Sequence, residues 1–141
     1  MKKRVNLTWV VLGVPVMTSL VSLGSSSMRQ DEEAVVSYKT EVVPIIKKYC
    51  LPCHAEESYN PSKLALDSHA LLMMGGEHGA SVVPGKPGES VLIQKLGEEP
   101  PFGDRMPLKS RRAKKTDAPK KLTAEEMQLL SRWIAQGAKE N

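Results

Sequence analysis

The chain has 141 residues and a formal net charge of +4, a length that allows one ordinary domain and excludes several. Three of its basic residues, Lys2, Lys3 and Arg4, stand at the N-terminus, so the remainder is close to neutral and its positive charge is local. Without an N-terminal leader about 110 residues remain, which are few for burying a large core unless a bound cofactor adds apolar bulk.

The N-terminal segment has the outline of a secretory signal. The basic residues are followed by an uncharged stretch, NLTWVVLGVPVMTSLVSLG, and then by small residues that offer cleavage points. We expect residues 1–26 to be a signal peptide or, if uncleaved, an N-terminal membrane anchor, because the apolar run approaches the length that spans a bilayer. In both cases the domain lies outside the cytoplasm, in the periplasm or an equivalent compartment. Residues 27–37 are expected to be a linker.

Apolar residues recur at helical spacing from about residue 37 to residue 49. Pro44 lies inside this segment, so the helix either begins near Thr40, with the proline just past its first turn, or kinks there. Ser68, or Asp67 before it, is suited to cap a short helix that two glycines end after Met74.

The second half of the chain continues the helical pattern. A Gly- and Pro-rich loop over residues 76–88 precedes a short helix at residues 89–96, and a long irregular stretch follows. The last helix is the best marked, because Thr123 and Glu126 form a capping box. No segment alternates with a period of two. The predicted fold class is therefore all-α, with three to five short helices joined by ordered loops.

Both cysteines of the chain and one histidine form the motif Cys50-x-x-Cys53-His54. This spacing is typical of c-type haem attachment, in which two thiols add to the porphyrin and the adjoining imidazole binds the iron. Three alternatives stay open. A thioredoxin-like dithiol would sit after a strand, a zinc site would need a second tight ligand pair, and a structural disulfide would close only a tiny loop.

A haem iron has a second axial position, for which a methionine thioether is a soft, neutral ligand. Met106 is favoured, because Pro107 forces it into an extended conformation and because about fifty residues separate it from His54, enough to reach the other haem face. The remaining candidates are Met73, Met74 and Met127, of which Met127 lies on the apolar stripe of the last helix, where packing is the usual role.

These pieces, in the order VVPIIKKYCLPCH, LALDSHALLMMGGEHGASVVPGKPGESVLIQKL, RMP and LTAEEMQLLSRWIAQGA, resemble bacterial c-type cytochromes of the planctomycete type. The resemblance covers about residues 38–138, within a haem domain that we place at residues 38–140. It implies a small cytochrome c-like fold whose first and last helices cross and whose loops wrap around one covalent haem c. It also implies Cys50 and Cys53 as attachment points, with His54 and Met106 as axial ligands.

Other polar residues receive simpler interpretations. His78 is expected on an exposed loop, with a role as an alternative haem ligand as the lesser possibility, and His69 is expected at the surface near a helix start. Arg105 and Lys86 are candidate partners of the haem propionates. Trp133 is expected in the core where the helices cross.

Residues 109–121, from Lys109 to Lys121, carry a strongly basic run with one acidic residue, Asp117. Such a run is either a solvated loop or a docking patch for an acidic redox partner or an anionic membrane surface. Nucleic acid is not an expected partner, because the aromatic residues that stack on bases are missing.

The leading functional hypothesis is electron transfer by a secreted or membrane-tethered monohaem cytochrome, which is a carrier that can serve a separate oxidoreductase and not itself an enzyme. The main alternative is a haem sensor or a catalytic haem with an open sixth coordination site. A dithiol or zinc module without haem is the third hypothesis.

Overall fold

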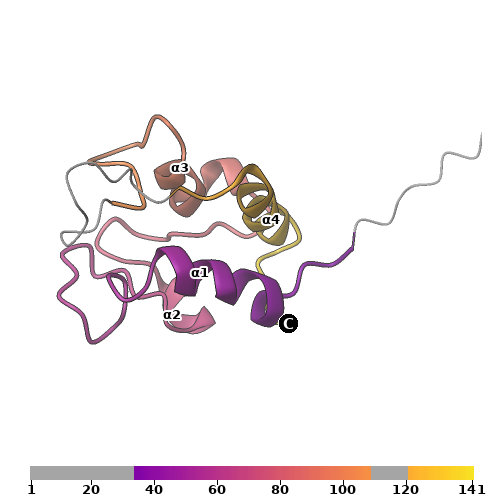
Figure 1. Ribbon diagram of the computed structural model, residues 1–141, viewed down its shortest axis with the longest axis horizontal. Helices are drawn as coiled ribbons and strands as arrows, with labels where there is room; N and C mark the ends of the chain where they lie inside the picture. The colour runs from indigo at the N-terminus through magenta and orange to yellow at the C-terminus, as the bar shows by residue number, and fades with distance from the viewer. Residues whose placement is uncertain (1–33, 109–120) are drawn as a thin grey trace, which may run out of the picture. The chain divides into compact units, whose positions relative to one another are not determined.

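The computed structural model describes residues 34–108 and 121–141, and within these ranges the chain is helical and has no strand (Figure 1). These residues belong to one compact unit, Glu33–Asn141. The predicted all-α class is confirmed, whereas wrapping around a haem stays a prediction. The predicted signal or anchor and most of the linker lie outside the described residues. Within the described ranges no helix has the length and apolar character needed to cross a membrane.

The first helical segment changes from a π-helix to an α-helix just before its proline. A π-helical turn, η1 (Tyr38–Val42), leads into α1 (Val43–Tyr49), so Pro44 falls within the first turn of α1. The Val43 amide donates to the Tyr38 carbonyl oxygen, so helical hydrogen bonding continues through the π-helical turn up to the proline, which has no N–H of its own. Ser37 caps the segment by accepting a hydrogen bond from the Thr40 amide.

The middle of the chain contains two six-residue helices, and the first of them has the predicted cap and stop. In α2 (His69–Met74), the Ser68 side chain accepts a hydrogen bond from the Leu71 amide, and Gly75 ends the helix with a φ of 81°. A Cβ at Gly75 would lie 2.2 Å from the Gly79 carbonyl oxygen, so only glycine fits this return. The Gly- and Pro-rich loop leads through a 3-10 turn, η2 (Pro87–Glu89), into α3 (Val91–Leu96).

The last helix, α4 (Ala124–Ala135), has the predicted capping box between Thr123 and Glu126. Its buried residues Leu130, Trp133 and Ile134 lie at helical spacing. α4 contacts η1, and the Trp133 ring lies 5.4 Å from the Tyr38 ring. The expected core position of Trp133 is confirmed, since it is only 1 % exposed. The first and last helical segments are in contact, and their crossing stays a prediction.

The C-terminal segment returns to the start of the first helix (Figure 1). The Lys39 amide donates to the Asn141 carbonyl oxygen at 3.2 Å, and the Tyr38 amide donates to the Asn141 side chain at 2.8 Å. His69 lies under this segment, with its Nε2 2.7 Å from the Ala138 carbonyl oxygen and its ring 5.0 Å from that of Tyr38. His69 stands at the start of α2 as expected, but its side chain is only 17 % exposed, because the returning C-terminal segment partly covers it.

Candidate haem site

Cys50 and Cys53 lie on the turn that follows α1. The Cys50 amide donates to the Ile46 carbonyl oxygen at 2.8 Å, and the His54 amide donates to the Cys50 carbonyl oxygen at 3.0 Å. This turn therefore holds all three residues of the motif in one local, helix-like unit. Both cysteines are free thiols; Cys53 is exposed, whereas Cys50 is half-buried and packs against the apolar core.

The surroundings of Cys50 argue against a dithiol catalyst. Burial raises the pKa of the Cys50 thiol to about 11. Redox-active thiols of the thioredoxin type instead have a lowered pKa, produced by a helix N-terminus or a neighbouring cation. Cys50 stands at the C-terminal end of α1, where the helix dipole disfavours a thiolate.

His54 is held by the loop that follows it. Its Nδ1 lies 3.0 Å from the Leu64 carbonyl oxygen, and its own carbonyl oxygen accepts a hydrogen bond from the Leu66 amide at 2.8 Å. An imidazole that donates Nδ1–H to a carbonyl keeps the lone pair on Nε2 for a metal, and such a partner fixes the ring orientation. The free Nε2 of His54 and the carbonyl that holds its Nδ1 thus fit the role of a proximal haem ligand.

Asn60 organises the same loop and was not singled out in the sequence. Its Nδ2 donates to the Leu64 carbonyl oxygen and lies 3.4 Å from His54 Nδ1. Its Oδ1 accepts hydrogen bonds from the Ser62 amide at 3.2 Å and from the Ser62 hydroxyl at 2.7 Å. Asn60 therefore shapes the loop so that the Leu64 carbonyl reaches His54.

Met106 is half-buried and packs against the same apolar core as Cys50. Its amide donates to the Lys95 carbonyl oxygen at 2.7 Å, which ties it to the end of α3. Met73 and Met127 also border the core, whereas Met74 is 75 % exposed. The structure thus places Met106 beside the core together with Cys50, and its pairing with His54 across a haem stays a prediction.

The expected partners of the propionates are engaged elsewhere. Arg105 pairs with Glu98 at 2.6 Å, and Lys86 pairs with Glu89 at 3.1 Å. His78 is exposed, as expected. Of the basic run, only Lys121 falls within the described residues, and its Nζ lies 3.7 Å from Glu98.

Two further features bear on the alternatives. Among the described residues, no group of three or more His, Cys, Asp and Glu side chains is placed to hold a metal ion, so the zinc hypothesis has no ligand set there.

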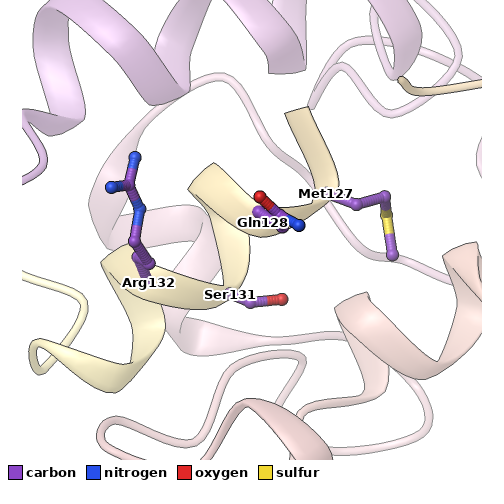
Figure 2. Close-up of a pocket in the computed structure, with 4 residues that line it drawn as sticks. All are labelled: Met127, Gln128, Ser131 and Arg132. Atoms are coloured by element: carbon purple, nitrogen blue, oxygen red, sulfur yellow. The ribbon is translucent and has the colours of Figure 1, made fainter. Parts of the chain in front are cut away.

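Figure 2 shows a hollow along α4 lined by Met127, Gln128, Ser131 and Arg132. All four come from one helix and none is a predicted site residue except Met127, a lesser candidate. A second hollow borders the segment after His54 and is lined by residues that include Ala55, Asn60 and Leu71.

A helical domain with a Cys-x-x-Cys-His turn and a supported histidine is an arrangement typical of c-type cytochromes. Comparison with protein families agrees, because residues 50–107 match the family model described as Planctomycete cytochrome C. The predicted family resemblance is confirmed over these residues, which include Cys50, Cys53, His54 and Met106. A cytochrome c domain indicates haem-based electron transfer. No curated protein and no solved structure matches the chain.

Proposed function

We propose that this protein is a monohaem c-type cytochrome that transfers single electrons between redox proteins outside the cytoplasm. One haem c is attached through Cys50 and Cys53, with His54 and Met106 as axial ligands. The observation that carries the proposal is the His54 Nδ1 contact with the Leu64 carbonyl oxygen, formed directly after two free thiols within the family match.

Each residue has a distinct task in this proposal. Cys50 anchors the cofactor against the apolar core, and Cys53 anchors it at the exposed side of the turn. His54 presents Nε2 because its other ring nitrogen is engaged by a backbone carbonyl. Met106 supplies a neutral thioether, which favours the reduced state and raises the reduction potential. The haem itself supplies an iron that accepts and returns one electron.

The direct test is the intact mass and the absorption spectrum of protein exported through a haem-attachment pathway. We expect the mass of the polypeptide plus one haem, and in the oxidised spectrum a thioether-to-iron charge-transfer band. Folded, colourless protein with the polypeptide mass alone would contradict the proposal.

The sixth ligand is tested by comparing Met106→Ala with Met74→Ala. Met106→Ala is expected to lose the charge-transfer band and to bind carbon monoxide rapidly when reduced. Met74→Ala is the matched control, because the Met74 side chain is largely exposed, and it should behave as the wild type. If wild-type protein already bound carbon monoxide fully and lacked the band, the haem sensor or open-site alternative would replace electron transfer.

We further propose an acidic redox partner, or an anionic membrane surface, for the basic run at residues 109–121. This proposal rests on sequence charge, since most of the run lies outside the described residues. Electron transfer to an acidic partner should then slow as salt screens the attraction.

A further inference from the structure

We propose that Lys95 is a positioning residue for the sixth haem ligand. It holds the segment of residues 102–106, here called the Met106 strap, against the end of α3. The inference rests on the proposed function, because it concerns how Met106 is kept in place as a ligand.

The end of α3 offers backbone acceptors that the helix itself cannot use. The carbonyl groups of the last turn of a helix have no partner within the helix. Two of them are occupied by the strap: the Lys95 carbonyl oxygen accepts from the Met106 amide at 2.7 Å, and the Leu96 carbonyl oxygen accepts from Arg105 Nε at 2.9 Å. The strap thereby supplies hydrogen-bond donors to two carbonyl groups at the C-terminal end of α3.

The Lys95 side chain binds the other end of the same strap. Its ammonium group donates to the Phe102 carbonyl oxygen at 2.5 Å and also to the Asp104 carbonyl oxygen. The same nitrogen lies 4.7 Å from the centre of the Phe102 ring. An ammonium group has three donors and no acceptor, so two carbonyl groups and an aromatic face satisfy it.

The strap is shaped to present both carbonyl groups to one cation. Gly103 stands between Phe102 and Asp104 with a φ of 51°, in the left-handed region. The His78 ring also stacks on Phe102, with ring centroids 4.1 Å apart. Lys95 is thus the one residue in the described ranges whose backbone holds Met106 while its side chain holds the strap four residues earlier.

Holding the strap matters because a thioether ligand competes with any small ligand that reaches the iron. If the strap opens more often, the fraction of molecules able to bind an external ligand rises, and the apparent affinity rises in proportion. Loss of the Lys95 donors removes charge-assisted hydrogen bonds to two exposed residues, Phe102 and Asp104, so the effect should be moderate.

The test uses the haem-loaded protein with Lys95→Met, which keeps the length of the side chain but removes its donors. Imidazole binding to the oxidised protein should tighten about fivefold in this variant, and the charge-transfer band should weaken. Lys95→Arg retains donors and should restore imidazole affinity to within about twofold of wild type. Lys39→Met is the charge-matched control, because Lys39 is exposed on η1 and has no proposed role at the haem, and it should leave both readouts unchanged.

The outcomes separate this inference from the proposed function. If the wild type shows the thioether band and Lys95→Met binds imidazole within about twofold of it, the positioning role is overturned while the proposed function stands. The same holds if Lys39→Met matches the effect of Lys95→Met, because the cause would then be charge alone. If wild type and Met106→Ala bind imidazole equally, Met106 is not the ligand and both fail.

Discussion

Trp133 contacts three separate parts of the chain from its buried position in α4, so its replacement is a sharp test of the fold. Its ring packs on Tyr38 of η1 at 5.4 Å and lies 6.1 Å from His69 of α2. Its Nε1–H donates to the Lys139 carbonyl oxygen at 2.9 Å. One residue of α4 thus contacts the first helical segment, the start of α2 and the C-terminal segment.

The change Trp133→Phe keeps an aromatic ring but removes the indole nitrogen and part of the buried volume. The lost hydrogen bond contributes about 1 kcal/mol, because Lys139 is exposed and its carbonyl can bind water instead. The missing apolar atoms and the small cavity add about 1–2 kcal/mol, a fraction of the roughly 3–5 kcal/mol typical of truncating a buried aromatic residue to alanine. We therefore expect the free energy of unfolding to fall by about 2–3 kcal/mol.

The assay is guanidinium unfolding of the haem-loaded protein, followed by far-ultraviolet circular dichroism and by haem absorbance. Gln128→Ala on the exposed side of α4 is the matched control and should change the unfolding free energy by less than about 0.5 kcal/mol. A loss below about 1 kcal/mol for Trp133→Phe would refute the reasoning, because the contacts described would then contribute little to stability.

Two further predictions concern the start of α4. Thr123→Ala removes the side chain that accepts from the Glu126 amide at 3.2 Å, and thermal or chemical unfolding should show a loss of about 1 kcal/mol; no loss would mean that the capping box contributes nothing. Glu126 also accepts hydrogen bonds from Lys48 at 2.9 Å and from Tyr49 at 2.7 Å. Burial raises the pKa of Glu126, but hydrogen bonds from the Thr123 backbone and from the Lys48 and Tyr49 side chains outweigh it, so the net pKa is lower than the ordinary value of 4.5. The ionised carboxylate therefore stabilises the fold above that value, and the contribution is lost as pH falls through the lowered folded pKa. Glu126→Gln should be less stable than wild type at neutral pH, and the difference should shrink in acid; a difference independent of pH would contradict this linkage.

The helices were predictable where local chemistry sets their ends. Ser68 and Thr123 cap the helices that follow them, and Gly75 and Gly97 end helices where the sequence placed stops. These signals depend on a side-chain acceptor or on backbone freedom within a few residues, so sequence alone contains them. The Cys-x-x-Cys-His motif was equally predictable, because its three residues lie close in sequence and share one turn of the chain.

Features that depend on distant contacts could not be predicted in the same way. His69 looked like a surface residue because nothing nearby in sequence covers it, whereas its partner Ala138 lies 69 positions away. Asn60 and Lys95 were not recognised because most of their partners are backbone groups, which every residue has. The π-helical turn before Pro44 lets the helix continue where sequence rules allowed only a start or a kink.

The distribution of buried apolar side chains supports a cofactor in the region of the family match. Of thirteen buried hydrophobic residues, nine lie outside residues 50–107, although this segment makes up more than half of the described chain. The four inside it are Leu66, Leu72, Val82 and Leu96. Other apolar side chains of the segment, such as Leu51, Leu64 and Ile93, are only partly buried against the core. Backbone hydrogen bonds between its loops, such as the one from the Glu77 amide to Ser62, add to these contacts. Backbone hydrogen bonds give little net stability compared with apolar burial. A large, rigid, apolar group attached at Cys50 would add contact surface for the side chains of this segment that are only partly buried.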